Sequence, residues 1–170
     1  GARQALAQAV EALEGTQRAR LLVRINAEGT PWHAEDLRAL TQLVEMGVAG
    51  VVVSKAERAQ TLHAVARAAG AQAALLPLIE SVAGLDAAAA LAAAPQVVRL
   101  AFGHLDFQVD AGMACGLEEE ELLPIRMALV LASRRAGIGA VVDGVTVETR
   151  NPERLALDAA RARRMGFGGK

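Results

Sequence analysis

Short apolar runs rich in β-branched residues alternate along the whole chain with longer amphipathic segments. The apolar runs lack in–out alternation, which is typical of strands buried on both faces, and they span residues 21–26, 48–54, 73–80, 97–102 and 138–145. The amphipathic segments are expected to be helices and span residues 2–14, 34–46, 57–69, 83–93, 119–136 and 152–165. One helix followed by strand–helix units predicts an α/β fold with a parallel sheet and right-handed crossovers.

Local signals agree with this division. Asn151 and Pro152 supply an N-cap and a first-turn proline. Glycines follow the expected ends of four helices, at positions 47, 70, 137 and 166. The acidic residues 118–121 lie at an expected helix N-terminus, where the helix dipole favours negative charge, so they require no functional explanation.

Two architectures fit this order of elements. A doubly wound five-stranded sheet would be complete at 170 residues, whereas a (β/α)8 TIM barrel has eight units and typically about 250 residues. The isolated first helix, and residues 166–170 where another strand is expected, suggest an incomplete barrel of about five βα units that lacks its first and last strands. No linker or low-complexity tract interrupts the chain, so we expect a single domain over residues 1–170.

Composition limits the classes of partner that the chain is expected to bind. The 18 basic and 19 acidic residues nearly cancel, which removes the field that non-specific nucleic-acid binding needs. We therefore expect no nucleic-acid partner. No apolar stretch approaches the roughly 20 residues of a membrane helix, so no membrane partner is expected either. The single cysteine, Cys115, cannot form an internal disulfide, which favours a cytoplasmic location.

Polar side chains lie at the end of every expected strand, at the edge where parallel-sheet proteins bind ligands. Glu80 ends an otherwise apolar strand, and Asp106 follows the next one. Two carboxylates without an adjacent histidine or cysteine suit a hard, oxygen-preferring ion, of which Mg²⁺ is the natural candidate. The alternatives are a capping or salt-bridged role for Glu80 and a turn or cap role for Asp106.

Arg24 is the third candidate site residue. It lies inside an apolar strand, where a guanidinium is costly to desolvate, and its planar fork suits a carboxylate or a developing enolate oxygen. The alternative is a buried salt bridge to a neighbouring acid. Lys55 and Asp143 are expected to support their neighbours.

The histidines and one long connection are weaker candidates. His63 is expected on a solvated helix face, His33 at the start of a helix, and His104 close to the proposed ion but not bound to it. Residues 108–117 are predicted to form a long connection over the site, either a lid or a plain surface loop.

Six segments in this order resemble the citrate lyase beta-chain group of the HpcH/HpaI aldolase superfamily. They are Val23-Arg24-Ile25-Asn26-Ala27, Val51-Val52-Val53-Ser54-Lys55, Leu78-Ile79-Glu80-Ser81-Val82-Ala83-Gly84-Leu85, Phe102-Gly103-His104-Leu105-Asp106, Val142-Asp143-Gly144-Val145 and Gly166-Phe167-Gly168-Gly169-Lys170. The resemblance covers almost the whole chain. It departs at Ser54, where a proline usually precedes the lysine, and at His104, where a small or hydroxylated residue is common.

The resemblance implies a TIM barrel, assembled as a homotrimer or hexamer, that uses Mg²⁺ to make or break a carbon–carbon bond. Glu80 and Asp106 match the family's two metal-binding carboxylates, and Arg24 matches the arginine that faces the substrate carbonyl and enolate. The implied reaction is cleavage or formation of a 3-hydroxyacyl-CoA, citryl-CoA-like or malyl-CoA-like, through an acetyl-CoA enolate and a metal-chelated keto acid. Keto acid and acyl-CoA are then the small-molecule partners.

Three other interpretations stay open from the sequence. A pyruvate-type class II aldolase would use the same metal without CoA. A catalytically silent barrel or assembly module would need no base, and no residue of the chain is assigned that role. A receiver-like domain would be expected to cluster acids at the end of its first strand, where this chain has Arg24.

Overall fold

The computed structural model describes all 170 residues and contains one parallel sheet. Its strands are β1 (Leu22–Ile25), β2 (Gly50–Val53), β3 (Ala74–Ile79) and β4 (Ala101–Phe102), hydrogen-bonded in the order β1-β2-β3-β4. Each strand therefore pairs in parallel with the next strand along the chain. This confirms the predicted α/β class with a parallel sheet.

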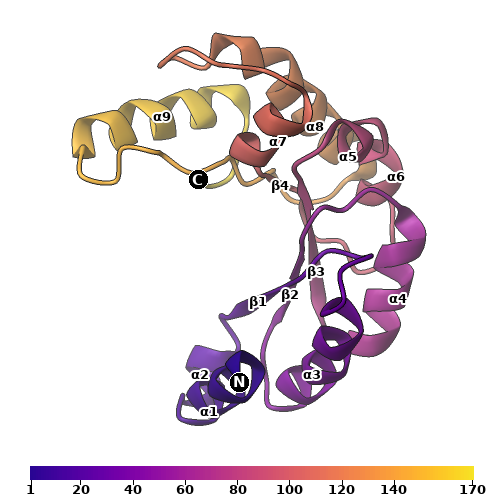
Figure 1. Cartoon of the computed structure of the whole chain (residues 1–170). Coiled ribbons are helices and arrows are strands. Elements are labelled where there is room, and N and C mark those ends of the chain that lie inside the picture. Colours follow the sequence, from indigo (N-terminus) through magenta and orange to yellow (C-terminus); the bar gives the residue numbers. More distant parts are fainter.

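Helices connect the strands and cover one side of the sheet (Figure 1). They are α1 (Ala2–Glu11), α2 (Gly15–Arg18), α3 (His33–Glu45), α4 (Ala59–Ala69), α5 (Val82–Asp86), α6 (Ala88–Ala92), α7 (His104–Asp110), α8 (Leu123–Ala136) and α9 (Pro152–Met165), with a 3-10 turn, η1 (Glu120–Leu122). The ribbon forms an open arc with α1 near one end and α9 at the other. No helix is long and apolar enough to span a membrane.

Residues 138–145, which were predicted to form a fifth strand, do not form a regular strand, so this prediction is wrong. Only Val142 forms bridges there, to Ala101 on one side and to Gly169 on the other. Backbone hydrogen bonds still join this segment to its neighbours, for example from Val142 N–H to the Leu100 carbonyl. Glycines at 137, 139 and 144 bracket the short apolar stretch, and glycine weakens a strand because it loses much backbone entropy and adds no packing.

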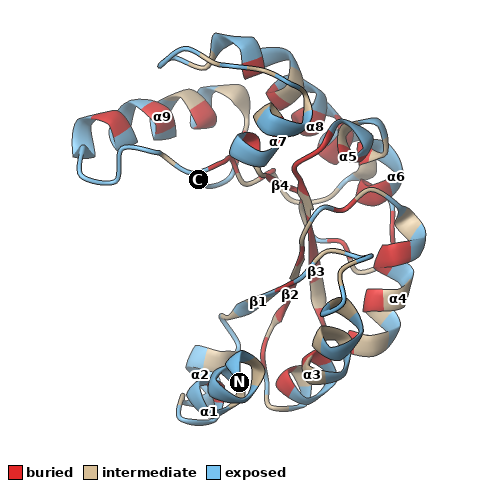
Figure 2. Ribbon diagram, in the orientation of Figure 1, coloured by how far each residue is buried: buried red, intermediate tan, exposed pale blue.

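The core lies between the sheet and its helices. Val51, Val53, Leu75 and Ile79 are fully buried, and they belong to one apolar cluster with helix residues such as Leu62. Figure 2 shows buried residues concentrated in the strands and on parts of the helices. Burying one such side chain stabilises the fold by about 1.5–3 kcal/mol.

The expectation that every strand is buried on both faces is wrong for β1. Leu22 is 39% exposed and Arg24 is also exposed, while Ile25 is buried. β1 is at the edge of the sheet, and helices cover only one face of it. Side chains of β1 that point to the other face are therefore exposed to solvent. The predicted desolvation of Arg24 therefore does not occur in this chain.

Most predicted helices are confirmed, with four changes. The expected helix at 83–93 is divided into α5 and α6, which meet at Ala87. The expected helix at 119–136 begins with the 3-10 turn η1 and continues as α8, and neither α2 nor α7 was expected. The cap at the start of α9 is as predicted: the Asn151 side chain accepts a hydrogen bond from Arg154 N–H, and Pro152 opens the helix.

Candidate metal and substrate site

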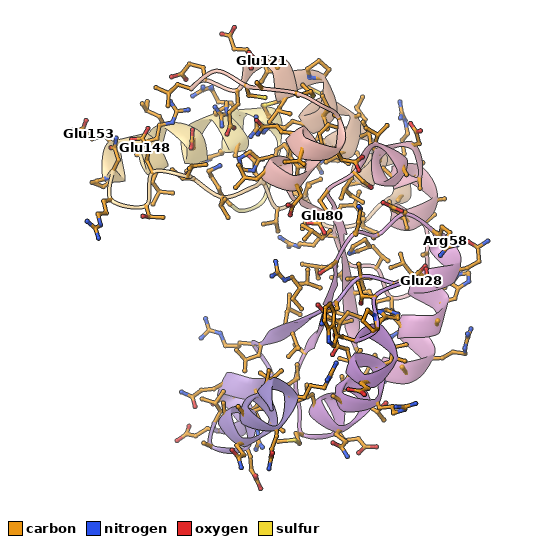
Figure 3. The ribbon with its side chains drawn as sticks, in the orientation of Figure 1. Glu28, Arg58, Glu80, Glu121, Glu148 and Glu153 are labelled. Atoms are coloured by element: carbon orange, nitrogen blue, oxygen red, sulfur yellow. The ribbon has the colours of Figure 1, made fainter.

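The carboxyl ends of β2, β3 and β4 bring three charged residues to one region. Lys55 follows β2, Glu80 follows β3 directly, and Asp106 lies in the first turn of α7 immediately after β4. Figure 3 shows Glu80 in the middle of the arc, well away from Glu121, Glu148 and Glu153. Parallel pairing of neighbouring strands explains why residues far apart in sequence meet here.

Glu80 is only 9% exposed and is fixed by backbone on two sides. The Lys55 backbone N–H donates to its Oε1 at 2.7 Å. On the other side lies Gly103, where an added Cβ would be 2.7 Å from the Glu80 Cβ and 2.8 Å from Oε2. Position 103 therefore needs a residue without a side chain for Glu80 to occupy its present place.

The charge on Glu80 is incompletely compensated. Burial raises the pKa of its carboxyl, and although the Lys55 N–H opposes that rise, the neighbouring Asp106 carboxylate adds to it. The Arg24 guanidinium lowers the Glu80 pKa, but as the weakest of these influences. A buried carboxylate whose charge is incompletely compensated destabilises the fold until a cation binds beside it.

A cavity of about 230 Å³ lies against these carboxylates and is lined by Lys55, Glu80, Asp106, Val109 and Asp110. Asp110 Oδ2 accepts a hydrogen bond from Val82 N–H at 2.8 Å, and its Oδ1 lies 4.0 Å from Lys55 Nζ. With all four groups ionised, three carboxylates and one ammonium give the lining a formal charge of −2.

The residues of this cavity fit a divalent cation. The donors are carboxylate oxygens, which Mg²⁺ prefers, and a charge of +2 would neutralise the lining. No group of three or more His, Cys, Asp or Glu side chains is arranged to hold a metal anywhere in the chain. A pair of carboxylates nevertheless matches Mg²⁺, which usually binds one or two protein carboxylates and completes its octahedron with water and substrate oxygens.

Arg24 lies apart from this cavity. It is exposed on β1, pairs in register with Val52, and lines a separate crevice against α1 and α3. Its charge still acts on Glu80. In the same crevice Asn26 has a structural role, since its side-chain amide donates to Asp36 Oδ2 at 2.7 Å.

His104 and Asp143 belong to a different cluster. His104 is 1% exposed, and its Nε2 lies 3.1 Å from Glu119 Oε1. Asp143 Oδ1 accepts a hydrogen bond from Arg126 Nε at 3.0 Å, and Lys170 Nζ lies 3.6 Å from its Oδ2. Both are therefore held inside the protein and do not line the Glu80 cavity.

Glu119 is the residue that the sequence analysis missed. The acidic run at 118–121 was explained by the helix dipole alone, yet Glu119 Oε2 pairs with Arg126 at 2.5 Å and Arg161 at 2.8 Å. Burial opposes ionisation, but the neighbouring His104 ring and the hydrogen bond from Arg126 lower its pKa to about 2. Arg161 lies 42 residues further along the chain, so no local pattern indicated this partner.

The structure gives the positions of His63, His33 and the long connection. His63 is exposed on α4 as predicted, and His33 begins α3 with its Nδ1 2.8 Å from the Asn26 carbonyl. The connection predicted at 108–117 begins later, because residues 108–110 are the last turn of α7. Its remaining part borders a second cavity through Cys115 and Leu117.

Comparison with known proteins gives consistent results. The family model described as HpcH/HpaI aldolase/citrate lyase matches residues 1–170. A (3S)-malyl-CoA thioesterase of Cereibacter sphaeroides is 31% identical over 162 residues, which cover 88% of this chain and 50% of the relative. The chain thus spans about half the length of the curated relatives it matches.

Two solved structures share this fold. RipC from Yersinia pestis superposes with a TM-score of 0.82 at 31% identity, covering 98% of this chain and 74% of that one. CitE from Mycobacterium tuberculosis, solved in complex with magnesium, acetoacetate and coenzyme A, gives 0.79 at 28% identity, covering 98% and 59%.

Proposed function

We propose that this chain, which belongs to the HpcH/HpaI aldolase/citrate lyase family, carries the metal site of a magnesium-dependent carbon–carbon lyase. The substrate would be a 3-hydroxyacyl-CoA, citryl-CoA-like or malyl-CoA-like. The observation that carries this proposal is the pairing of Glu80 and Asp106 on one cavity, with the Glu80 pKa raised. The magnesium, acetoacetate and coenzyme A bound by the CitE relative support the same ligand classes.

Glu80 and Asp106 would hold Mg²⁺ through their carboxylate oxygens. The ion would supply Lewis-acid polarisation of the keto-acid oxygens. The Lys55 N–H and the absent side chain at Gly103 keep Glu80 in place, so the site is formed before the metal binds. Such preorganisation lowers the cost of binding.

Arg24 would act on the other half of the substrate. When the carbon–carbon bond breaks, the substrate hydroxyl gives its proton to a base and becomes the keto-acid carbonyl. The electron pair of the broken bond moves onto the thioester fragment, which leaves as the acetyl-CoA enolate and then takes up a proton to give acetyl-CoA. The guanidinium is exposed toward solvent in this chain and is free to donate hydrogen bonds to that developing oxyanion. Removing such a group typically costs on the order of 10²–10³ in rate.

The strand order supports an incomplete (β/α)8 barrel as the architecture. β1 to β4 are neighbours in chain order, and the bridges at Val142 and Gly169 extend the same order by two further positions. A doubly wound sheet reverses its strand order at a switch point, and no reversal occurs among these strands. We propose further that residues 1–170 form one domain, that the protein assembles as a homotrimer or hexamer, and that it is cytoplasmic.

Thioester hydrolysis is a second candidate, favoured by the 31% identical malyl-CoA thioesterase. The two activities leave different products from malyl-CoA. A lyase releases acetyl-CoA and glyoxylate, whereas a thioesterase releases malate and free CoA.

The deciding experiment combines binding with product analysis. We expect Mg²⁺ binding, measured by calorimetry, to be lost in Glu80→Gln and retained in Glu153→Gln, which removes an exposed carboxylate on α9. Incubation with malyl-CoA or citryl-CoA and Mg²⁺ should then yield acetyl-CoA. Free CoA as the main product would favour the thioesterase, while binding of free keto acid but no CoA thioester would favour the aldolase. Unchanged Mg²⁺ affinity in Glu80→Gln would contradict the metal site.

A further inference from the structure

The chain has two lysines, and the structure uses them differently. Lys170 is 7% exposed at its side chain, and its Nζ donates to the Gly144 carbonyl at 2.8 Å and lies 3.6 Å from Asp143 Oδ2. Lys55 is 50% exposed at its side chain, and its ammonium has one partner, Asp110 Oδ1, at 4.0 Å. The ammonium of Lys55 is therefore available to a ligand, while that of Lys170 is committed to the fold.

Lys55 is also held in an unusual backbone conformation. Its φ is +46°, in the left-handed region that lysine seldom adopts. Such strain persists only where the surrounding structure imposes it. Here the same residue donates its N–H to Glu80 and places its side chain on the wall of the cavity.

We propose that the Lys55 ammonium binds the carboxylate of the keto acid in the Glu80–Asp106 cavity. This inference rests on the proposed function, because the keto acid enters with the metal. The charge of the cavity lining supports this proposal. Once a divalent cation has neutralised the lining's formal charge of −2, an incoming anion meets the Lys55 ammonium, which is the basic side chain of that lining. Arg24 lines a different crevice and is left for the other half of the substrate.

Asp110 lies near the Lys55 ammonium without satisfying its hydrogen-bonding capacity. Its Oδ2 is fixed by the Val82 N–H at 2.8 Å, so the carboxylate stays at the cavity wall. At 4.0 Å its pairing with Lys55 is a weak, solvent-screened interaction. A ligand carboxylate can replace it at small cost.

The test uses Lys55→Met, which removes the charge and keeps both the N–H and most of the side-chain length. Calorimetry with Mg²⁺ alone, and with pyruvate in the presence of Mg²⁺, is expected to give changes of opposite sign. Mg²⁺ should bind more tightly, because the positive charge of the Lys55 ammonium no longer repels it. Pyruvate should bind about ten- to a hundredfold more weakly, because a charge-assisted hydrogen bond is lost.

Three further variants make the result decisive. Lys55→Arg should restore much of the pyruvate affinity. Lys55→Gly, which relieves the backbone strain, should lose it like Lys55→Met. Arg58→Met, which removes an exposed cation paired with Glu28 outside the cavity, should change neither affinity.

The outcomes separate the two proposals. If the wild-type chain binds Mg²⁺ and pyruvate and Lys55→Met binds pyruvate equally well, the role of Lys55 is overturned and the metal site stands. If Glu80→Gln binds Mg²⁺ like the wild type, the metal site fails and the role of Lys55 fails with it. A parallel fall in both affinities in Lys55→Met would indicate a structural role and would also overturn the inference.

Discussion

Two carboxylate clusters, around Glu119 and around Glu80, differ in how far their charge is compensated. Around Glu119, four acids meet four bases, and every member except the exposed Glu118 has a largely buried side chain. The ion pairs join Glu118, Glu119, Asp143 and Asp158 to Arg126, Arg154, Arg161 and Lys170. Around Glu80, three carboxylates share one partly exposed lysine. The pKa of Glu119 is lowered to about 2, whereas that of Glu80 is raised. We infer that the first cluster stabilises the fold, and we propose that the second binds a ligand.

The largest expected effect comes from removing a cation in the Glu119 cluster. Arg126 is completely buried and pairs with both Glu119 and Asp143. Arg126→Met should reduce the free energy of unfolding by about 3–5 kcal/mol, since two buried carboxylates each lose one of their two cationic partners. Urea unfolding of the metal-free protein measures this. A loss under about 1 kcal/mol would mean that the Glu119 cluster does not stabilise the fold.

The pH dependence of stability tests the same cluster. The folded-state pKa of Glu119 is about 2, below its ordinary value of 4.5, so its contribution is complete above pH 4.5 and disappears as pH falls toward 2. A shift of this size corresponds to about 3 kcal/mol. Unfolding curves between pH 6 and pH 2 should show this loss in the wild type and much less of it in Glu119→Gln. Equal slopes for the two proteins would assign the acid sensitivity elsewhere.

Gly103 tests the geometry of the second cluster. Gly103→Ala places a methyl group within 2.7 Å of the Glu80 Cβ, so the carboxylate must move away from its position beside Asp106. We expect Mg²⁺ affinity to fall about tenfold, equivalent to about 1.4 kcal/mol. Gly116→Ala is the matched control, because the nearest atom to its added Cβ is 3.8 Å away. Equal affinities in the two variants would show that Glu80 tolerates displacement.

The smallest expected effect has the opposite sign from those in the Glu119 cluster. Because the folded-state pKa of Glu80 is raised, its ionisation destabilises the metal-free fold, and this penalty grows as pH rises from 4.5 through the folded pKa. Glu80→Gln should therefore raise the free energy of unfolding at pH 7 by about 1 kcal/mol while abolishing Mg²⁺ binding. A lower stability in this variant would make Glu80 a structural residue and remove the contrast between the clusters.

The sequence predicted that Glu80 and Asp106 lie together, as they do on one cavity, because short-range rules apply there. Glu80 and Asp106 were found because both follow apolar strands, and parallel strands end at a common edge. Glu119 was missed because its partner Arg161 lies far along the chain. α7 was missed because a seven-residue helix is too short to show a helical period. The exposure of Arg24 depends on which face of the sheet is covered, and the apolar pattern of β1 does not state that.

The donor that holds Glu80 Oε1 is an amide of the main chain, at a residue with φ of +46°. Alanine scanning would leave that donor untouched and would report position 55 only through its side chain. The position of Glu80 Oε1 thus depends on the backbone conformation at residue 55 and not on the side chain there. Any residue that tolerates the left-handed turn could donate this hydrogen bond to Glu80, and proline alone among the twenty lacks the hydrogen to do so.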